Sequence, residues 1–467
     1  MLIRNAELDF GERVDLRIED AHIAAIDHVL RATAGEIVID AAACALLPGL
    51  NDHHLHLAAL AAAQVSVQCG PPQVHSAEEL GAALRKAAAH SEAGWIRGVG
   101  YHESVAGEID RDWLDRIVDA RPLRIQHRSG RLWILNTAAL AEIGAFDARA
   151  SPLQRSADRI SGRLYDADAW LRSRLRSQRP NLQHLSRQLA SYGVVGVTDT
   201  SHDNDLEALR YFADAQASGE LLQDVFAMGN ASLDQIGNVG TVLRGPHKFH
   251  LHEHELPPFE PLCAMIRASH GVGRAVAFHC VSRTELVFAL AALREAGAQA
   301  GDRIEHSGVT PPEALQQMAE LGVTVVTQPS FIAERGDAYL QEVDADDVAW
   351  LYRLQSFDAA GVALAGSTDA PYASADPWAA MQAAVTRRTP SGQLLGVAEA
   401  LRPERAFALF SGAAQTPAAP RRIAVGAVAD LCLLDRPWRQ ARDDLAAVRV
   451  RLTLRRGQTI FSVAIPS

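Results

Sequence analysis

The sequence predicts an α/β protein in which a closed parallel (β/α)8 barrel carries a small β domain built from both ends of the chain. Two observations predict the barrel. Eight short β-like runs alternate with helical signals, and polar residues end these runs at intervals of whole strand–helix units. The β-rich character of both ends predicts the small domain. At 467 residues the chain is too long for one core of ordinary size and long enough for both parts.

Composition and charge narrow the functional classes. The hydrophobic content of 48% is that of a soluble globular protein, and the net charge of -11 argues against nucleic acid or an anionic membrane as the partner. No basic start followed by an apolar run and no membrane-spanning stretch is evident, so we expect a cytoplasmic protein. Five cysteines lack Cys-x-x-Cys spacing, which argues against a disulfide framework and a thiolate zinc site: Cys44, Cys69, Cys263, Cys280 and Cys432.

The predicted elements follow in order along the chain. Short β-like runs separated by charged turns fill residues 1–44 and 420–467. Helices between the barrel runs have clear signals: Thr310 is the expected N-cap before Pro311 and Pro312, with Gly322 as the stop, and Asp376-Pro377 starts another helix in the same way. The eight barrel runs are 46–57, 193–203, 223–229, 247–251, 275–280, 302–307, 323–329 and 362–370.

The first barrel run, LLPGLNDHHLHL, ends in two histidines two residues apart, His54 and His56. In an extended strand the period of two places both imidazoles on one face, together with Asp52. Neutral imidazoles that converge in this way are typical metal ligands. In a chain with 18 histidines a bare pair is more often incidental, so a metal site requires further ligands downstream.

Polar residues also end four later runs: Lys248, His279, His306 and Asp369. Their separations of 31, 27 and 63 residues correspond to one, one and two strand–helix units. Such spacing places them at matching heights around one barrel mouth, where the carboxyl ends of the strands meet. Packing alone does not explain six such residues in phase, because an unpartnered ring of histidines and a carboxylate is costly to desolvate.

Lysine is rare in this chain. Of 45 basic residues only Lys86 and Lys248 are lysines. Lys86 falls off the apolar face of a helix that begins behind a capping box of Ser76 and Glu79, so it has an ordinary surface explanation. Lys248 has no such explanation, and its position at a strand end indicates a place where arginine cannot serve.

Taken with Lys248, the segments PGLNDHHLH, FHC, RIEHS and GSTDAP resemble the amidohydrolase superfamily, specifically the N-substituted formamide deformylase-like branch of amidohydrolase family 3. GWIRGVGYHE, RSGRLWILNTAAL, TQPSF and ADLCLLD are similar to that branch in the same order, over most of the chain. The resemblance implies a metal-dependent (β/α)8 TIM barrel at 45–419 and a β-sandwich from residues 1–44 plus 420–467. It also implies an insertion between the first and second barrel strands, which matches the irregular pattern at about 60–186.

The resemblance further implies one or two divalent metals, with zinc the expected ion. Lys248, carboxylated by carbon dioxide, would bridge a metal pair, because burial can lower the pKa of an amine whereas guanidinium stays protonated. Asp369 would take the proton from the nucleophilic water, and Lys248 and His306 complete the catalytic set. His54 and His56 would hold one metal with Asp369. The other two histidines, His279 and His306, would hold the second.

Five residues are candidate substrate contacts: Tyr101, Glu103, Arg128, His252 and Gln328. Ordinary packing explains Tyr101 as well as substrate contact does. An internal ion pair likewise explains Arg128 as well as substrate contact does. An arginine near the mouth would suit a substrate carboxylate. The run HKFHLHEHEL departs from the family, since His250, His252 and His254 alternate on the side of Lys248. Three interpretations remain for these histidines: substrate contacts, alternative ligands of a one-metal site, or a polar loop. The identity of the substrate is therefore undetermined.

The expected function is hydrolysis of an amide-type C–N bond of a small molecule by a metal-activated water. Cyclic amide hydrolysis and deamination on the same site are alternatives that only a substrate screen separates. A non-catalytic metal-binding scaffold is the third alternative, and the complete ligand set argues against it. We expect a small-molecule substrate, no nucleic acid and no membrane partner, and we consider a homodimer as one assembly.

Overall fold

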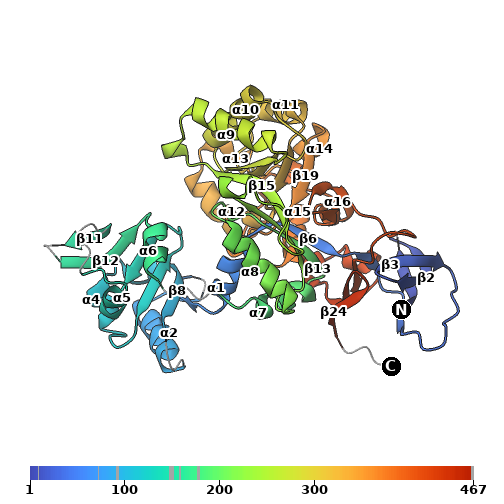
Figure 1. The fold of residues 1–467 in the computed structure, drawn as a ribbon, viewed down its shortest axis with the longest axis horizontal. Coiled ribbons are helices and arrows are strands. Elements are labelled where there is room, and N and C mark those ends of the chain that lie inside the picture. Colours follow the sequence, from blue (N-terminus) through green and yellow to red (C-terminus); the bar gives the residue numbers. More distant parts are fainter. Residues whose placement is uncertain are drawn as a thin grey trace. The chain divides into compact units, whose positions relative to one another are not determined.

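The computed structural model describes residues 1–8, 10–71, 73–90, 94–146, 152–156, 159–175 and 179–463. The chain divides into two compact units (Figure 1). The first unit combines Met1–Leu57 with Asn181–Ser467, and the second is Ala58–Pro180. Both ends of the chain therefore belong to one unit, and the second is an insertion into it.

The first unit contains an eight-stranded parallel sheet in which each strand pairs with the next along the chain. At its edges the sheet closes through the segment after the last strand, since the Asp369 N–H donates to the His54 carbonyl at 2.8 Å and the His56 N–H to the Ala370 carbonyl at 2.9 Å. All eight predicted runs are strands, and the (β/α)8 prediction is confirmed. The strands are β6 (Leu50–Leu55), β13 (Val194–Asp199), β14 (Asp224–Gly229), β15 (Leu243–His250), β16 (Val276–Cys280), β17 (Arg303–His306), β18 (Thr324–Thr327) and β19 (Ala363–Gly366).

Helices follow the barrel strands, and local signals set their ends. Asp376 caps the helix after β19, accepting hydrogen bonds from the N–H groups of Trp378 and Ala379, as predicted. Gly322 ends another helix in the left-handed conformation, with φ of 66°. The helices are α7 (Gln183–Ser191), α8 (Leu206–Ala217), α9 (Phe259–Gly271), α10 (Arg283–Ala296), α11 (Pro312–Leu321), α12 (Ser330–Glu342), α13 (Ala345–Val348), α14 (Gln355–Ala359), α15 (Pro377–Thr386), α16 (Pro403–Ala408) and α17 (Trp438–Ala441).

One predicted helix start is wrong. The residue at the N-cap of α11 is Pro311, and the Thr310 hydroxyl donates to the Ser307 carbonyl at 2.9 Å instead of accepting from the helix. Ser307 lies directly after the strand residue His306, so this hydroxyl supports the turn that leaves the barrel strand. The Thr310 side chain bonds within this turn and therefore does not cap the helix.

Both ends of the chain build a β-sandwich, as predicted. One sheet has the order β3-β2-β1-β4 and the other β24-β23-β22-β5. Leu16, Ile23, Leu46, Leu433 and Leu452 are buried in one cluster, so the core joins residues from both ends of the chain. The strands are β1 (Leu2–Leu8), β2 (Glu12–Glu19), β3 (His22–Asp27), β4 (Val38–Asp40), β5 (Leu46–Pro48), β22 (Leu431–Leu434), β23 (Val450–Arg455) and β24 (Gln458–Ser462), and a separate hairpin pairs β20 (Gly412–Ala413) with β21 (Thr416–Pro420).

The second unit has a sheet of its own, in the order β11-β12-β10-β9-β8-β7. Residues 122–136 form two antiparallel strands, because a turn intervenes in which Gly130 has φ of 76°. Buried clusters around Leu80 and Ile125 and around Trp133 and Leu140 give the unit its own cores. The elements are α1 (Leu57–Gln64), β7 (Val67–Gln68), α2 (Ala77–His90), β8 (Ile96–Tyr101), α3 (Glu103–Ala106), α4 (Arg111–Asp115), β9 (Leu123–His127), β10 (Leu132–Leu135), α5 (Thr137–Glu142), β11 (Leu153–Ser156), β12 (Arg159–Tyr165) and α6 (Asp168–Arg174).

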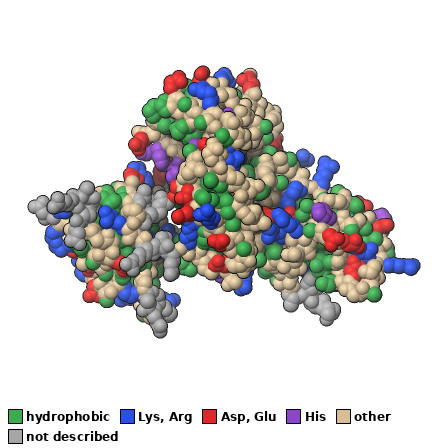
Figure 2. All heavy atoms as spheres, viewed as in Figure 1, with side chains coloured by type: hydrophobic (Ala, Val, Ile, Leu, Met, Phe, Trp, Pro, Cys, Tyr) green, Lys and Arg blue, Asp and Glu red, His purple; other side chains and the backbone are tan. Residues whose placement is uncertain are grey.

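Charged side chains of both signs are interspersed over the visible face of the molecule (Figure 2). Across the described ranges, none of the helices combines the length and the apolar character that a membrane span demands.

Loss of the Asp376 cap should weaken the fold. We expect Asp376→Ala to lower the free energy of unfolding by about 1 kcal/mol, because two N–H groups at the start of α15 lose their acceptor. Urea denaturation of the purified protein measures the change. Asp376→Asn is the control, since its side-chain oxygen can still accept. Equal losses in the two variants would show that the cap is not the cause.

Candidate metal centre

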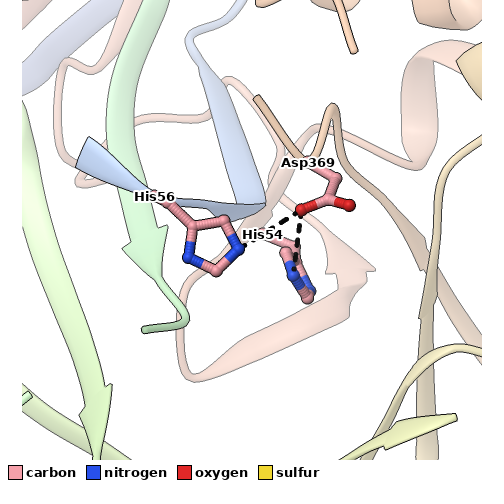
Figure 3. A group of neighbouring side chains, drawn as sticks. All are labelled: His54, His56 and Asp369. Atoms are coloured by element: carbon pink, nitrogen blue, oxygen red, sulfur yellow. Dashed lines mark ion pairs between the residues drawn. The ribbon is translucent and has the colours of Figure 1, made fainter. Parts of the chain in front are cut away.

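Three residues converge at the carboxyl end of the barrel sheet. His54 lies in β6, His56 directly follows that strand, and Asp369 follows β19. The Nε2 atoms of both imidazoles lie 3.4 Å from Asp369 Oδ1 (Figure 3). One donor atom from each of the three residues lies within 4.8 Å of the others. This is the pair predicted from the first strand, together with the carboxylate predicted at the end of the last.

The backbone that presents Asp369 is fixed to the first strand. Asp52 is buried, and its carboxylate accepts hydrogen bonds from the Thr368 N–H at 3.1 Å and from the Thr368 hydroxyl. Asp369 itself has φ of 57°, in the left-handed region that costs a non-glycine residue on the order of 1–3 kcal/mol. The hydrogen bonds across this edge hold the strained residue in place. Asp52 therefore positions the carboxylate of Asp369.

The remaining predicted ligands lie on consecutive strands beside this group. Lys248 is on β15, His279 on β16 and His306 on β17. The His306 ring centroid is 4.7 Å from that of His54 and 4.5 Å from that of His279. Burial lowers the pKa of His279 and His306, and the ammonium of Lys248 lowers it further. The same ammonium opposes a net rise in the pKa of His54, so the Lys248 side chain lies close to all three imidazoles. The structure thus brings together all six residues that the strand-end spacing predicted.

Lys248 is buried, with 6% of its surface exposed. Its Nζ has no hydrogen-bond partner among the described residues. Burial lowers the pKa of this amine to about 8. An orphaned buried ammonium is costly, and an amine with a lowered pKa supplies the neutral nitrogen that reacts with carbon dioxide.

The protonation states favour metal ligation. Burial lowers the pKa of His306 to about 3 and that of His279 well below its usual value, so both imidazoles are neutral at physiological pH. Burial alone would raise the pKa of Asp369, but His54, His56 and His306 beside it hold that pKa well below the usual range. The centre therefore combines the neutral imidazoles of His279 and His306 with an ionised carboxylate, whereas Asp369 and Glu305 raise the pKa of His54 against the effect of burial.

Glu305 is a functional residue that the sequence analysis missed. It is fully buried, and its Oε2 lies 2.5 Å from Nδ1 of His54. Burial would raise its pKa, but Arg303, Lys248 and His54 hold the pKa below the usual range, so Glu305 is ionised. A carboxylate that accepts from Nδ1 leaves Nε2, which faces Asp369, free to bind a metal. The adjacent Arg303, whose Nε donates to Glu305 at 2.7 Å, completes this support.

The residues present fit a divalent metal. Three donors converge within 4.8 Å, and in the part of the chain that the structure describes these are the only three His, Cys, Asp or Glu residues whose donors converge so closely. Asp369 Oδ1, which faces both imidazoles, is buried without a hydrogen-bond partner in the same described residues. Imidazole and carboxylate donors are typical zinc ligands.

The five candidate substrate contacts lie in different settings. Gln328 is buried, accepting from Nδ1 of His306 at 2.8 Å and donating to Ser367, so here it orients His306. His252 is exposed after β15. In the second unit, the hydroxyl of buried Tyr101 donates to the Gly107 carbonyl at 2.6 Å, and Glu103 lies 3.1 Å from Nε2 of His127. The N–H of Arg128 donates to the Tyr101 carbonyl, and substrate contact stays a prediction for all five.

Comparisons with known proteins agree with this geometry. The sequence matches the profile of the amidohydrolase family over residues 37–461. The N-substituted formamide deformylase of Arthrobacter pascens is 23% identical over 435 residues, which cover 80% of this chain and 79% of that protein. Two crystal structures described as metal-dependent hydrolases share the fold. That from Pyrococcus horikoshii OT3 has a TM-score of 0.75 at 20% identity and covers 98% of this chain and 99% of its own. That from Pyrococcus furiosus has a TM-score of 0.72 at 21% identity, with 93% and 98% covered.

Glu305→Gln should weaken metal binding by about 10- to 100-fold, because it removes the charge that supports His54 as a ligand. Competition with a chelator of known affinity measures the change. Glu399→Gln is a matched control, since Glu399 is also buried and also accepts from an arginine, Arg353, at 3.1 Å. Comparable weakening in the control would indicate that general destabilisation, and not the loss of support for His54, is responsible.

Proposed function

This chain belongs to the amidohydrolase family and is a metal-dependent amidohydrolase, and we propose that it cleaves the amide bond of a small N-acyl or N-formyl compound at a zinc pair bridged by carboxylated Lys248. The resemblance read from the sequence motifs is thereby confirmed at the level of the family. The observation that carries the proposal is the convergence of His54, His56 and Asp369 next to the buried, unpartnered amine of Lys248.

In the proposal each ligand has a role. His54 and His56 would hold one ion with Asp369, and His279 on β16 and His306 on β17 would hold the second. The bridge forms when the neutral Nζ of Lys248 attacks carbon dioxide: a nitrogen–carbon bond forms, the nitrogen releases a proton and the product carries one negative charge. Conversion of a buried cation into an anion would remove the desolvation cost of the orphaned ammonium and would supply two oxygens as ligands.

The residues of this chain then perform the proton transfers. When bound, divalent metal polarises the substrate carbonyl and lowers the pKa of the attacking water. Asp369 is ionised and receives the proton of that water at Oδ2, the oxygen that faces His306 at 3.9 Å rather than the His54 and His56 nitrogens. It then passes the proton to the leaving nitrogen, which departs as a neutral amine. Glu305 and Gln328 fix the rings of His54 and His306 throughout.

The substrate class is proposed from two supports. The Arthrobacter pascens relative is named as a deformylase of N-substituted formamides, and it covers most of this chain. The ionised carboxylate of Asp369 suits transfer of a proton to an amine leaving group. We propose the cytoplasm as the compartment, which the five free and buried cysteines support, since unpaired thiols are usual in a reducing environment.

Metal analysis tests the bridged pair. We expect two equivalents of divalent metal per chain in the purified protein, and the loss of at least one in a Lys248→Ala/His279→Ala variant. Lys86→Ala, which changes the other lysine, should keep both equivalents. Full occupancy in the double variant, or no bound divalent metal in the parent protein, would rule out the bridged pair.

A substrate panel tests the reaction. The protein should hydrolyse N-formyl or N-acyl amines, and Asp369→Asn should lower kcat by about 10²- to 10⁴-fold through loss of the proton carrier. Release of formate or carboxylate from each compound is the measurement, with Asp376→Asn as an adjacent control that should keep activity. Preference for cyclic amides, or release of ammonia from amino-substituted heterocycles, would replace the proposed substrate class while leaving the metal site intact.

A further inference from the structure

Four exposed histidines form a second group of metal-ligating side chains on the barrel unit. We call them the outer histidine group: His202, His250, His252 and His254. The ring centroids of His250 and His252 are 4.4 Å apart, those of His202 and His250 are 5.0 Å apart, and those of His252 and His254 are 5.7 Å apart. Figure 2 shows histidine side chains gathered in one patch at the surface of the barrel unit.

The barrel fold brings these residues together from two strands. His250 is the last residue of β15, two positions after Lys248, so the alternation of an extended chain continues outward from the buried lysine through His250 to His252. His202 lies in the segment that leaves β13. The outer histidine group therefore adjoins the candidate metal centre. The His250 ring contacts the ring of His279 at a centroid distance of 4.4 Å.

The spacing of the rings suits a shared ion. With a zinc–nitrogen bond of about 2.1 Å, two imidazoles on one ion have ring centroids roughly 5 Å apart. The separations of 4.4 Å and 5.0 Å around His250 fall near this value, as does the 5.6 Å between His54 and His56 in the catalytic centre. The nitrogens of the outer group are not drawn together as those of His54, His56 and Asp369 are. The flat torsional preference of an imidazole about χ2 allows exposed rings to turn toward an ion.

Acidic residues flank the group in the sequence and favour a cation. Asp203 follows His202 in the chain, while Glu253 and Glu255 alternate with His252 and His254. Glu253 is held in place by Thr284, whose hydroxyl donates to it at 2.8 Å. Imidazole donors select zinc, nickel and copper, whereas magnesium and calcium prefer oxygen donors.

We propose that His202, His250 and His252 bind a divalent cation of the zinc, nickel or copper type at the barrel mouth, separate from the catalytic metals. His254 lies beside this site and can replace one of the three ligands. The site does not depend on the substrate or on the reaction proposed above, because its ligands are distinct from the six residues of the catalytic centre.

Nickel binding to the holoenzyme tests the proposal. Equilibrium dialysis against Ni²⁺ should show one equivalent beyond the retained metals, and excess Mg²⁺ should not displace it. Removal of a side chain that only supports a ligand weakens metal binding by about 10- to 100-fold, so His202→Ala and His252→Ala should each raise the Kd by at least tenfold. His28→Ala, which changes an exposed histidine of the sandwich, should leave the Kd unchanged.

Lys248→Ala separates the outer site from the catalytic centre. This variant should keep the additional nickel equivalent although it loses catalytic metal. Loss of the additional equivalent in Lys248→Ala would show that the outer histidines are ligands of the catalytic ions, and would overturn the proposal. Unchanged nickel affinity in both histidine variants, or no additional equivalent in the holoenzyme, would overturn it as well. Circular dichroism of each variant establishes that the fold is retained.

Discussion

The closure of the barrel sheet is the constraint on which the site depends. The first strand and the segment after the last strand meet through backbone hydrogen bonds between His54 and Asp369 and between His56 and Ala370. The buried carboxylate of Asp52 adds side-chain hydrogen bonds to Thr368 across the same edge. Because His54 and His56 lie on one side of this edge and Asp369 lies on the other, the contacts that complete the barrel also assemble the candidate metal centre.

A balance of buried charges defines the rest of the centre. Arg303 and Lys248 are cations in the barrel interior, and Glu305 and Asp369 are the carboxylates that face them and the imidazoles. Removal of any single charged partner would leave another charge buried without compensation, which is strongly destabilising. This arrangement explains why the centre needs supporting residues that touch no substrate. It also explains why we propose carboxylation at Lys248, whose amine has no hydrogen-bond partner among the described residues.

Strand runs and strand-end spacing were enough to predict the barrel and the six convergent residues. Most residues of the eight strands are buried, which is typical of parallel strands covered on both faces. Glu305 escaped prediction because it immediately precedes His306, and a period of two assigns neighbours to opposite faces. His306 has φ of 68°, so the chain turns there and both side chains reach the centre. The strand order of the sheet in the second unit was not predicted either, since its strands are short and partly antiparallel.

The position of the ligands at the barrel edge has a thermodynamic consequence. In the proposed site an ion held by His54, His56 and Asp369 joins the first strand to the segment after the last, and so cross-links the two ends of the sheet. By thermodynamic linkage, any interaction that stabilises the closed edge of the sheet raises the affinity for the ion. Binding of the ion in turn stabilises the closed edge. Metal supply would then govern how long the barrel survives in the cell as well as how fast it works.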